Sequence, residues 1–384
     1  HRDLHLSLRR QRQMCIRDRA AADGFSTQQV IATLVSEDNN PVTSVPIDFT
    51  TSDGVITTRS VTDSLGQARA ELVSPAYPCQ ATIIASFADR KADTAYVDFK
   101  ALELDLRPEM QRMVADGIST QDLQVTLKTE DGTPVSGARI DFSTTNGVIT
   151  ASAVTDADGK ATATLRSAAS VSTATVTASY MDTYQAQTAV DFELPQVSIR
   201  AAPVSLVASP LISTAITAYV TFDDGEPVPD GTVVTFTTTE GVISPTATTV
   251  SGIADVELRP TGVANNDVEV TATVASSKAT TIVVFAPGEP EELVAYATPD
   301  TIPGNGTVST TIVAEVRDSH GNYVEDGTAV NFMLVEGNGA VNPVGLTAGG
   351  IATAKFVPGG GSGAARIQIS ASEAAVDEVV VIMS

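Results

Sequence analysis

Carboxylates on tight turns are the residues of this chain with the clearest capacity for chemistry. Asp156 and Asp158 stand in the sequence DADG, and Asp223, Asp224 and Glu226 stand in the sequence DDGE. Oxygen ligands of this kind are what calcium prefers. DADG, however, lacks the spaced downstream ligands of an EF-hand-type loop, and Asp-Gly is a common turn sequence in its own right. We therefore predict turns here and no metal site.

Side chains that could act as a catalytic base or nucleophile are few. His320, in DSHGNYV, is the only histidine beyond residue 5, and we interpret it as a solvated turn residue. Cys79, in AYPCQATIIA, precedes an apolar run and is expected to be half-buried or buried rather than reactive. The glycine-rich residues 359–365 join two expected strands and open no helix, which argues against a phosphate loop. The sequence predicts no catalytic residue, no metal ligand, no cofactor and no enzyme activity.

An arginine-rich segment at the N-terminus differs from the rest of the chain. Residues 9–19 read RRQRQMCIRDR, whereas the whole chain has 23 basic and 46 acidic side chains and a net charge of −23. Such a cluster could be a nucleic-acid-binding arm or the remnant of a signal peptide. Because the acidic remainder repels phosphate and anionic lipid, we expect no binding to nucleic acid.

The codons of this segment indicate another origin. Back-translation of His1–His5 and Arg9–Asp18 yields the two constant parts of a transposase-type sequencing adapter, with Leu6–Leu8 in place of its variable index. We therefore interpret residues 1–19 as a non-native segment. We expect residues 102–113 to form the first strand of the second repeat. The equivalent residues of the first repeat, 93 positions earlier, show no alternation of apolar and polar side chains. We expect domain one to lack its first strand and residues 1–19 to lie unpacked.

A long internal repeat organises the rest of the chain. Its anchors are Phe49, Phe142, Phe236 and Phe332, which are spaced 93, 94 and 96 residues apart. A turn such as EDNNPV or EDGTPV precedes each anchor, and a second turn with an alternating run follows it. This period, with so many turns, predicts seven or more short strands per repeat, as in an immunoglobulin-like β-sandwich.

Alternation along the expected strands indicates which side chains form the cores. Successive side chains of a strand point to opposite faces, so every second residue of LQVTLK (123–128) should be buried. The predicted core residues of the second repeat are Leu123, Val125, Leu127, Ile140, Phe142, Val176, Ala178 and Tyr180. Gly54, Gly147 and Gly241, which follow the anchors, are expected to adopt a positive φ.

Residues 116–165 resemble the bacterial Ig-like domain of group 1, which is repeated in intimin- and invasin-type adhesins. The resemblance rests on the ordered sequence DGISTQDLQVTLKTEDGTPV, then IDFSTTNGVIT, then DADGKATATL. Repeat one matches repeat two closely, whereas repeats three and four match at the anchors. The resemblance implies an all-β fold of tandem sandwiches after the non-native residues 1–19, with domains over residues 20–100, 101–194, 195–286 and 287–384.

The resemblance also implies a function. It suggests stalk repeats of an adhesin at the bacterial cell surface, with an outer-membrane anchor, a tip and a receptor contact in regions outside this sequence. The short junctions contain no Gly/Ser linker, which predicts an extended rod. The net negative charge predicts a monomer, and no apolar run approaches the roughly 20 residues of a transmembrane segment. One alternative is that the chain is a spacer of a secreted enzyme. The other is direct recognition of a host protein or glycan by one of the domains, for which the candidate residues are Tyr184, Tyr296 and Tyr323.

Overall fold

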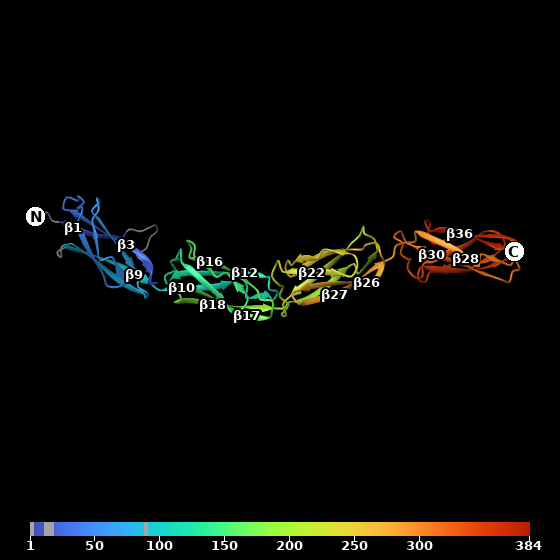
Figure 1. Cartoon of the computed structure of the whole chain (residues 1–384), viewed down its shortest axis with the longest axis horizontal. Helices are drawn as coiled ribbons and strands as arrows, with labels where there is room; N and C mark the ends of the chain where they lie inside the picture. The colour runs from blue at the N-terminus through green and yellow to red at the C-terminus, as the bar shows by residue number, and fades with distance from the viewer. Residues whose placement is uncertain (1–3, 11–18, 88–90) are drawn as a thin grey trace. The chain divides into compact units, whose positions relative to one another are not determined.

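The computed structural model describes residues 4–10, 19–87 and 91–384, and every regular element in these ranges is a β-strand (Figure 1). The expected all-β fold of tandem immunoglobulin-like sandwiches is confirmed. The chain divides into two compact units, His1–Glu193 and Leu194–Ser384, which are described separately. Within the described ranges, no helix has the length and apolar character needed to cross a membrane.

The first unit contains two sandwiches. Sandwich one consists of β1 (Leu4–Arg10), β2 (Arg19–Ala21), β3 (Thr27–Ser36), β4 (Pro46–Thr51), β5 (Val55–Ile56), β6 (Arg59–Val61), β7 (Gln67–Val73), β8 (Cys79–Phe87) and β9 (Lys91–Lys100). Sandwich two consists of β10 (Leu102–Pro108), β11 (Arg112–Val114), β12 (Thr120–Thr129), β13 (Arg139–Thr144), β14 (Val148–Ile149), β15 (Ser152–Val154), β16 (Lys160–Arg166), β17 (Ser172–Tyr180) and β18 (Tyr184–Glu193).

The second unit contains two more. Sandwich three consists of β19 (Gln196–Ala202), β20 (Ser205–Val207), β21 (Thr214–Thr221), β22 (Val233–Thr238), β23 (Val242–Ile243), β24 (Thr246–Thr248), β25 (Ile253–Arg259), β26 (Asn265–Val274) and β27 (Ser277–Ala286). Sandwich four consists of β28 (Glu292–Thr298), β29 (Thr301–Ile302), β30 (Thr310–Arg317), β31 (Ala329–Glu336), β32 (Gly339–Val341), β33 (Val344–Leu346), β34 (Ile351–Pro358), β35 (Gly363–Ser370) and β36 (Val376–Met383).

All four sandwiches share one topology. Each has a four-stranded sheet and a five-stranded sheet, with the strand orders β10-β12-β16-β14 and β11-β18-β17-β13-β15 in sandwich two. Residues 359–362 of the glycine-rich stretch connect β34 to β35, and residues 363–365 begin β35, so the stretch joins two strands as the sequence predicts. In the part of the chain that the structure describes, no sheet mixes strands of two sandwiches.

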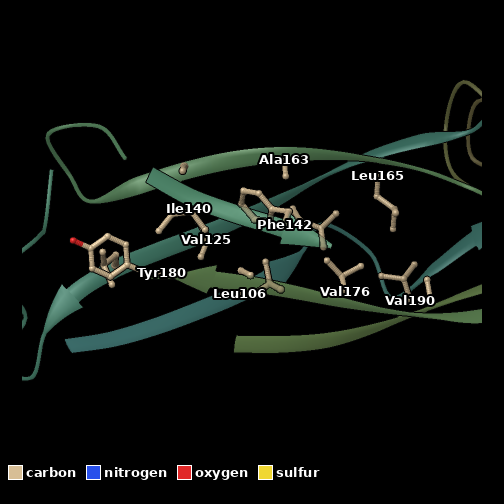
Figure 2. Close-up of a cluster of buried hydrophobic side chains, with 14 of the residues drawn as sticks. Leu106, Val125, Ile140, Phe142, Ala163, Leu165, Val176, Tyr180 and Val190 are labelled. Carbon is tan, nitrogen blue, oxygen red and sulfur yellow. The ribbon is translucent and has the colours of Figure 1, made fainter. Parts of the chain in front are cut away.

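The core of sandwich two lies between its sheets, and the predicted alternation is confirmed (Figure 2). All eight predicted core residues are buried, whereas Gln124, between two of them, is exposed. Phe142 and Tyr180 come from the five-stranded sheet, and Val125 comes from the facing sheet. Complete burial of an aliphatic side chain contributes about 1.5–3 kcal/mol, so these alternating residues hold the two sheets together.

The first strand of each repeat changes sheets. In sandwich two, β10 pairs antiparallel with β12, and after Pro108 the chain crosses over so that β11 pairs parallel with β18. Gln121 holds the crossing, because its side-chain Oε1 accepts a hydrogen bond from the Met110 N–H (2.8 Å). The expectation of one strand over residues 102–113 was wrong in this respect, since proline lacks the N–H that a ladder requires and interrupts it.

The expectation that domain one lacks its first strand was also wrong. β1 pairs antiparallel with β3 over seven residues, with Leu6 opposite Leu34 and Leu8 opposite Ala32. In sandwich two, Leu104 and Leu106 hold the matching positions opposite Leu127 and Val125. Backbone groups make an edge ladder whatever the origin of the sequence. β1 begins at Leu4, 98 residues before Leu102 of β10, so the constant offset of 93 misplaced the strand. Residues 1–3 and 11–18 of the predicted non-native segment lie outside the described residues.

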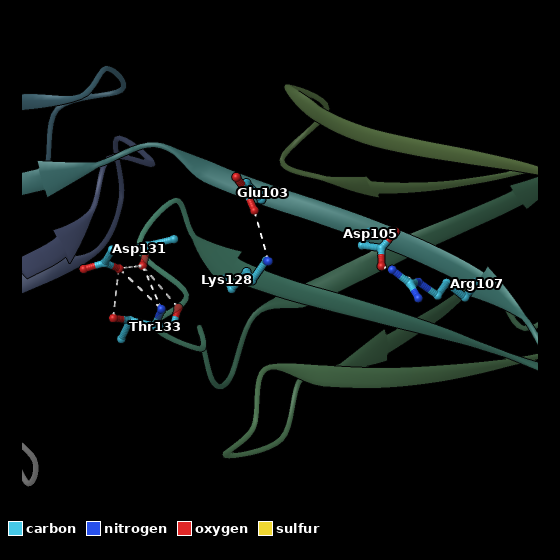
Figure 3. A network of polar contacts seen from close by, with 7 residues as sticks. Glu103, Asp105, Arg107, Lys128, Asp131 and Thr133 are labelled. Carbon is cyan, nitrogen blue, oxygen red and sulfur yellow. Dashed lines mark hydrogen bonds and ion pairs between the residues drawn. The ribbon is translucent and has the colours of Figure 1, made fainter.

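The outer face of the four-stranded sheet in sandwich two is polar and charged (Figure 3). Glu103 on β10 lies opposite Lys128 on β12, with Lys128 Nζ 3.1 Å from Glu103 Oε2, and Arg107 Nε lies 2.7 Å from Asp105 Oδ2. These side chains are well exposed, and exposed ion pairs contribute little to stability. Their effect is to keep this face in solvent and to discourage association of sheet with sheet.

The three anchor glycines adopt the predicted left-handed conformation. The φ angles of Gly54, Gly147 and Gly241 are 76°, 73° and 88°. At Gly147, a Cβ would stand 2.4 Å from the carbonyl oxygen of Arg166, so the turn requires glycine for its space as well as for its φ.

Candidate functional site

The carboxylates considered as calcium ligands serve as turn residues. Asp156 Oδ1 accepts hydrogen bonds from the N–H groups of Asp158 and Lys160, both at 2.9 Å. Asp224 Oδ1 accepts one from the Glu226 N–H (3.1 Å), and Asp223 Oδ1 accepts one from Gln196 Nε2 (2.8 Å). Among the described residues, no group of three or more His, Cys, Asp or Glu side chains could hold a metal ion. The arrangement favours turns over calcium binding.

We expect the melting temperature of the protein to be the same in chelator and in millimolar calcium. A ligand that binds only the folded state must raise the melting temperature by mass action. Differential scanning calorimetry in EDTA and in calcium chloride measures this, with magnesium chloride as a control for ionic strength. A rise specific to calcium would show that these turns form a site after all.

His320 and Cys79 lack the surroundings of catalytic groups. The exposed His320 lies on the turn after β30, its N–H donates to Asp318 Oδ1 (2.9 Å), and its ring lies against Gly262 of sandwich three. Cys79 is half-buried at the start of β8, as the sequence predicts. Burial, and secondarily the nearby Asp53 carboxylate, raises the pKa of the Cys79 thiol. A reactive cysteine requires the opposite shift.

The three candidate tyrosines belong to different units of the chain. Tyr184 belongs to sandwich two, where its hydroxyl donates to the Ala22 carbonyl oxygen (3.1 Å). Tyr296 and Tyr323 belong to sandwich four and are 45% and 41% exposed. Tyr184 is therefore a contact between sandwiches one and two, a role that was not expected from the sequence.

The link between sandwiches one and two is a single residue. β9 ends at Lys100, β10 begins at Leu102, and the carbonyl oxygen of the intervening Ala101 accepts a hydrogen bond from the Glu130 N–H (2.9 Å). Lys100 Nζ lies 3.8 Å from Glu130 Oε1. A one-residue link that is itself hydrogen-bonded restricts the rotation of one sandwich against the other.

A buried carboxylate lies at the same junction. Asp23, in the Asp-Gly turn after β2, is 5% exposed. Its Oδ1 accepts hydrogen bonds from the N–H groups of Phe25 (2.9 Å) and Ser26 (2.7 Å) and from Ser74 Oγ (2.7 Å). Its Oδ2 accepts a hydrogen bond of 2.5 Å from Ser26 Oγ and one of 3.2 Å from the hydroxyl of Tyr180, which belongs to sandwich two.

The pKa values at this junction follow from burial and hydrogen bonding. Burial alone would raise the pKa of the Asp23 carboxyl, but the bonds from Ser26, Phe25 and Ser74 outweigh it and hold that pKa below its ordinary value. Burial, followed by the charge and hydrogen bond of Asp23, raises the pKa of Tyr180 to about 12. At neutral pH an ionised carboxylate therefore faces a neutral phenol that donates to it.

The junction between sandwiches three and four uses another turn. Asp318, 2% exposed, accepts hydrogen bonds from the Gly288 N–H (2.8 Å) and from the Asn322 N–H and side chain (both 2.9 Å). Asn322 in turn accepts from the Ala264 N–H and donates to the Gly262 carbonyl oxygen, both at 2.9 Å. Burial alone would raise the pKa of Asp318, and these bonds outweigh it and lower that pKa.

A cleft of about 600 Å³ lies beside this second junction, lined among others by Asn266, Tyr323 and Glu325. The Arg317 guanidinium lies 3.8 Å from the centre of the Tyr323 ring, and the Gly350 backbone packs against the same ring closely enough that a Cβ there would clash. Because Arg317 and Gly350 pack against this ring, its capacity to stack on a sugar is restricted. The cleft therefore adds no support to direct glycan recognition.

Asp23, Tyr180 and Asp318 were not expected from the sequence to be junction residues. Asp-Gly reads as a turn wherever it occurs, and Tyr180 was expected in the core, where its ring indeed lies. The available signal was the Tyr-x-x-x-Tyr spacing of residues 180 and 184 at the ends of a hairpin. This spacing predicts a contact only once the partner turn, which is more than 150 residues away in the sequence, is known.

Comparison with known proteins agrees with this architecture. Residues 12–100 and 103–193 match the bacterial Ig-like domain (group 1), and the first match begins inside the segment interpreted as non-native. The D0-D1 domain of intimin is 24% identical, with 50% of this chain and 97% of that chain covered and a TM-score of 0.23. FdeC, an Escherichia coli adhesin, is 16% identical (74% and 96% covered, TM-score 0.37), and invasin, a bacterial integrin-binding protein, is 18% identical (99% and 79% covered, TM-score 0.26). The repeat pattern and the shared topology agree with this family match, so residues 12–100 and 103–193 are similar to two bacterial Ig-like domains of group 1.

Proposed function

We propose that this chain is a spacer segment of a bacterial surface adhesin, which carries an adhesive region away from the cell. The observation that supports this most directly is the one-residue link at Ala101, whose carbonyl oxygen is hydrogen-bonded to the following sandwich. A spacer must resist folding back on itself, and short bonded links provide that resistance without any catalytic or metal site. The adhesive tip, the receptor and the membrane anchor would belong to regions that this sequence does not include.

We expect small-angle X-ray scattering of the full chain in solution to report an elongated particle. Four sandwiches of roughly 35–40 Å each, placed end to end, give a length on the order of 150 Å. A compact globule of the same size would have a radius of gyration of about 21 Å. A variant with ten Gly/Ser residues inserted after Ala101 is the control, and it should broaden the distribution of distances. A compact particle for the unaltered chain would contradict the spacer proposal.

The cellular location is tested separately. An antiserum raised against residues 20–384 should label intact cells that express the complete protein, and external protease should remove the label. An antiserum against a cytoplasmic protein of the same cells is the control for membrane integrity. Label that appears only after the cells are broken open would contradict a surface location.

A further inference from the structure

We propose that the hairpin between β17 and β18 recognises the Asp-Gly turn of the preceding sandwich through Tyr180 and Tyr184, and that this contact makes sandwiches one and two a single cooperative unit. The partner surface is the turn Asp23–Ser26 together with the Ala22 carbonyl oxygen. The biological role of this contact rests on the proposed spacer function, whereas the existence of the contact is independent of that function.

The hydrogen bonds within the Asp-Gly turn do not require the tyrosines. In sandwich two, Asp116 accepts hydrogen bonds from the N–H groups of Ile118 (2.9 Å) and Ser119 (2.7 Å) and from Ser119 Oγ (2.7 Å) and Ser167 Oγ (2.9 Å). These bonds repeat, atom for atom, the local bonds of Asp23. They belong to the turn, and the bond from the Tyr180 hydroxyl is an addition to it.

The hairpin is shaped to present the two tyrosines. Tyr180 and Tyr184 pair across the end of the ladder, and their ring centres lie 6.4 Å apart. Met181 and Asp182, between them, have φ angles of 51° and 56°. Two consecutive positive φ angles, with the Thr183 N–H donating to the Tyr180 carbonyl oxygen (3.3 Å), are the geometry of the type I′ turn that closes tight hairpins. Here it brings two hydroxyl groups to the same side, where they donate to Asp23 and to Ala22.

The contact also removes the carboxylate from water. Asp23 is 5% exposed and Ala21 joins the core cluster of sandwich two, so the second sandwich covers the turn of the first. Burying a carboxylate is unfavourable unless its oxygens are hydrogen-bonded. The Tyr180 hydroxyl supplies one of the two bonds to Oδ2, beside that from Ser26 Oγ, and it is the one that comes from the other sandwich, so its loss should loosen the turn.

The second junction supports the assignment by contrast. In sandwich three the sequence SPLIST (209–214) replaces the Asp-Gly turn, and in sandwich four the hairpin between β35 and β36 reads ASEAA (371–375), without tyrosine. Both halves of the recognition are absent there, and the hydrogen bonds described at that junction involve Asp318 and Asn322 on another turn, with the His320 ring of the same turn against Gly262. The tyrosine pair and the Asp-Gly turn are thus both present at the junction of sandwiches one and two, and both are missing at the junction of sandwiches three and four.

Hydrogen exchange of the full chain, followed by mass spectrometry, tests the proposal. In Tyr180→Phe we expect the N–H groups of Phe25 and Ser26 to exchange about tenfold faster, because a bond to a charged group in the other sandwich is lost. The homologous N–H groups of Ile118 and Ser119 serve as an internal control and should keep their rates. Tyr296→Phe, which alters an exposed tyrosine of sandwich four, is the matched variant and should leave both turns unchanged.

Unchanged exchange at Phe25 and Ser26 in Tyr180→Phe would overturn the proposal. Faster exchange to the same degree at Ile118 and Ser119 would overturn it as well, because it would indicate general loosening of sandwich two. The result is independent of the scattering experiment: a compact particle with coupled turns would remove the spacer function and leave the recognition intact.

Discussion

Replacing Phe332 by alanine is expected to lower the free energy of unfolding of sandwich four by about 3–5 kcal/mol. This anchor side chain is 2% exposed and belongs to the core cluster between the two sheets. Its removal takes away buried apolar surface and leaves a cavity that the rigid sheets cannot close. Since a change of 1 kcal/mol moves the melting temperature of a domain of this size by roughly 4–8 °C, calorimetry of the full chain should show one transition displaced by more than about 12 °C.

Met333→Ala is the matched control, because Met333 is the next residue of β31, points to the opposite face and is 55% exposed. Substitutions at such surface positions usually stay within about 0.5 kcal/mol. Equal losses in the two variants would show that alternation along β31 does not separate core from solvent, contrary to the structure.

Replacing Gly147 by alanine is expected to destabilise sandwich two by about 2–5 kcal/mol. The left-handed φ of 73° is unfavourable for a residue with a Cβ, and the added Cβ would stand 2.4 Å from the carbonyl oxygen of Arg166 and 3.1 Å from the Phe192 ring. Backbone and a buried ring cannot move aside as a flexible side chain does. Urea unfolding, monitored by the circular dichroism of the strands, measures the loss.

Gly132→Ala separates the two causes. Gly132 has a φ of 83°, but a Cβ there would meet nothing within 4 Å. Only the conformational part of the effect remains, about 1–2 kcal/mol. If the two variants lost the same stability, the close approach of Arg166 to Gly147 would have no energetic weight.

The strand interiors were the most predictable part of this fold. Leu123, Val125 and Leu127 alternate with polar residues. In a strand with one buried face, a shift of register by one residue would place these apolar side chains in solvent, so only one register buries them. The same pattern recurs four times, so an error in one repeat is corrected by the others. Turn glycines were predictable for a similar reason, because an acidic or amide residue followed by glycine after an anchor strand has few alternatives.

The first strand was harder to predict, because it depends on more than its own side chains. The division into β10 and β11 reflects the missing N–H of Pro108 together with the Gln121 contact to Met110, and the second of these involves another strand. The pairing of β1 with β3 shows the same limit. An edge strand has one partner, and its ladder is made of backbone groups, which any sequence without proline supplies.

The composition and repeat of this sequence predict an all-β chain of tandem immunoglobulin-like repeats, and its alternation predicts the core residues of the second repeat. Those features depend on local or periodic patterns of side chains, and hydrophobic burial follows directly from the order of apolar and polar residues. Only the tertiary structure decided which turn meets which hairpin. Asp23 and Tyr180 are 157 residues apart, and each also has a sufficient role within its own sandwich. A contact between two folded surfaces depends on their shapes, and neither surface exists until its sandwich has folded.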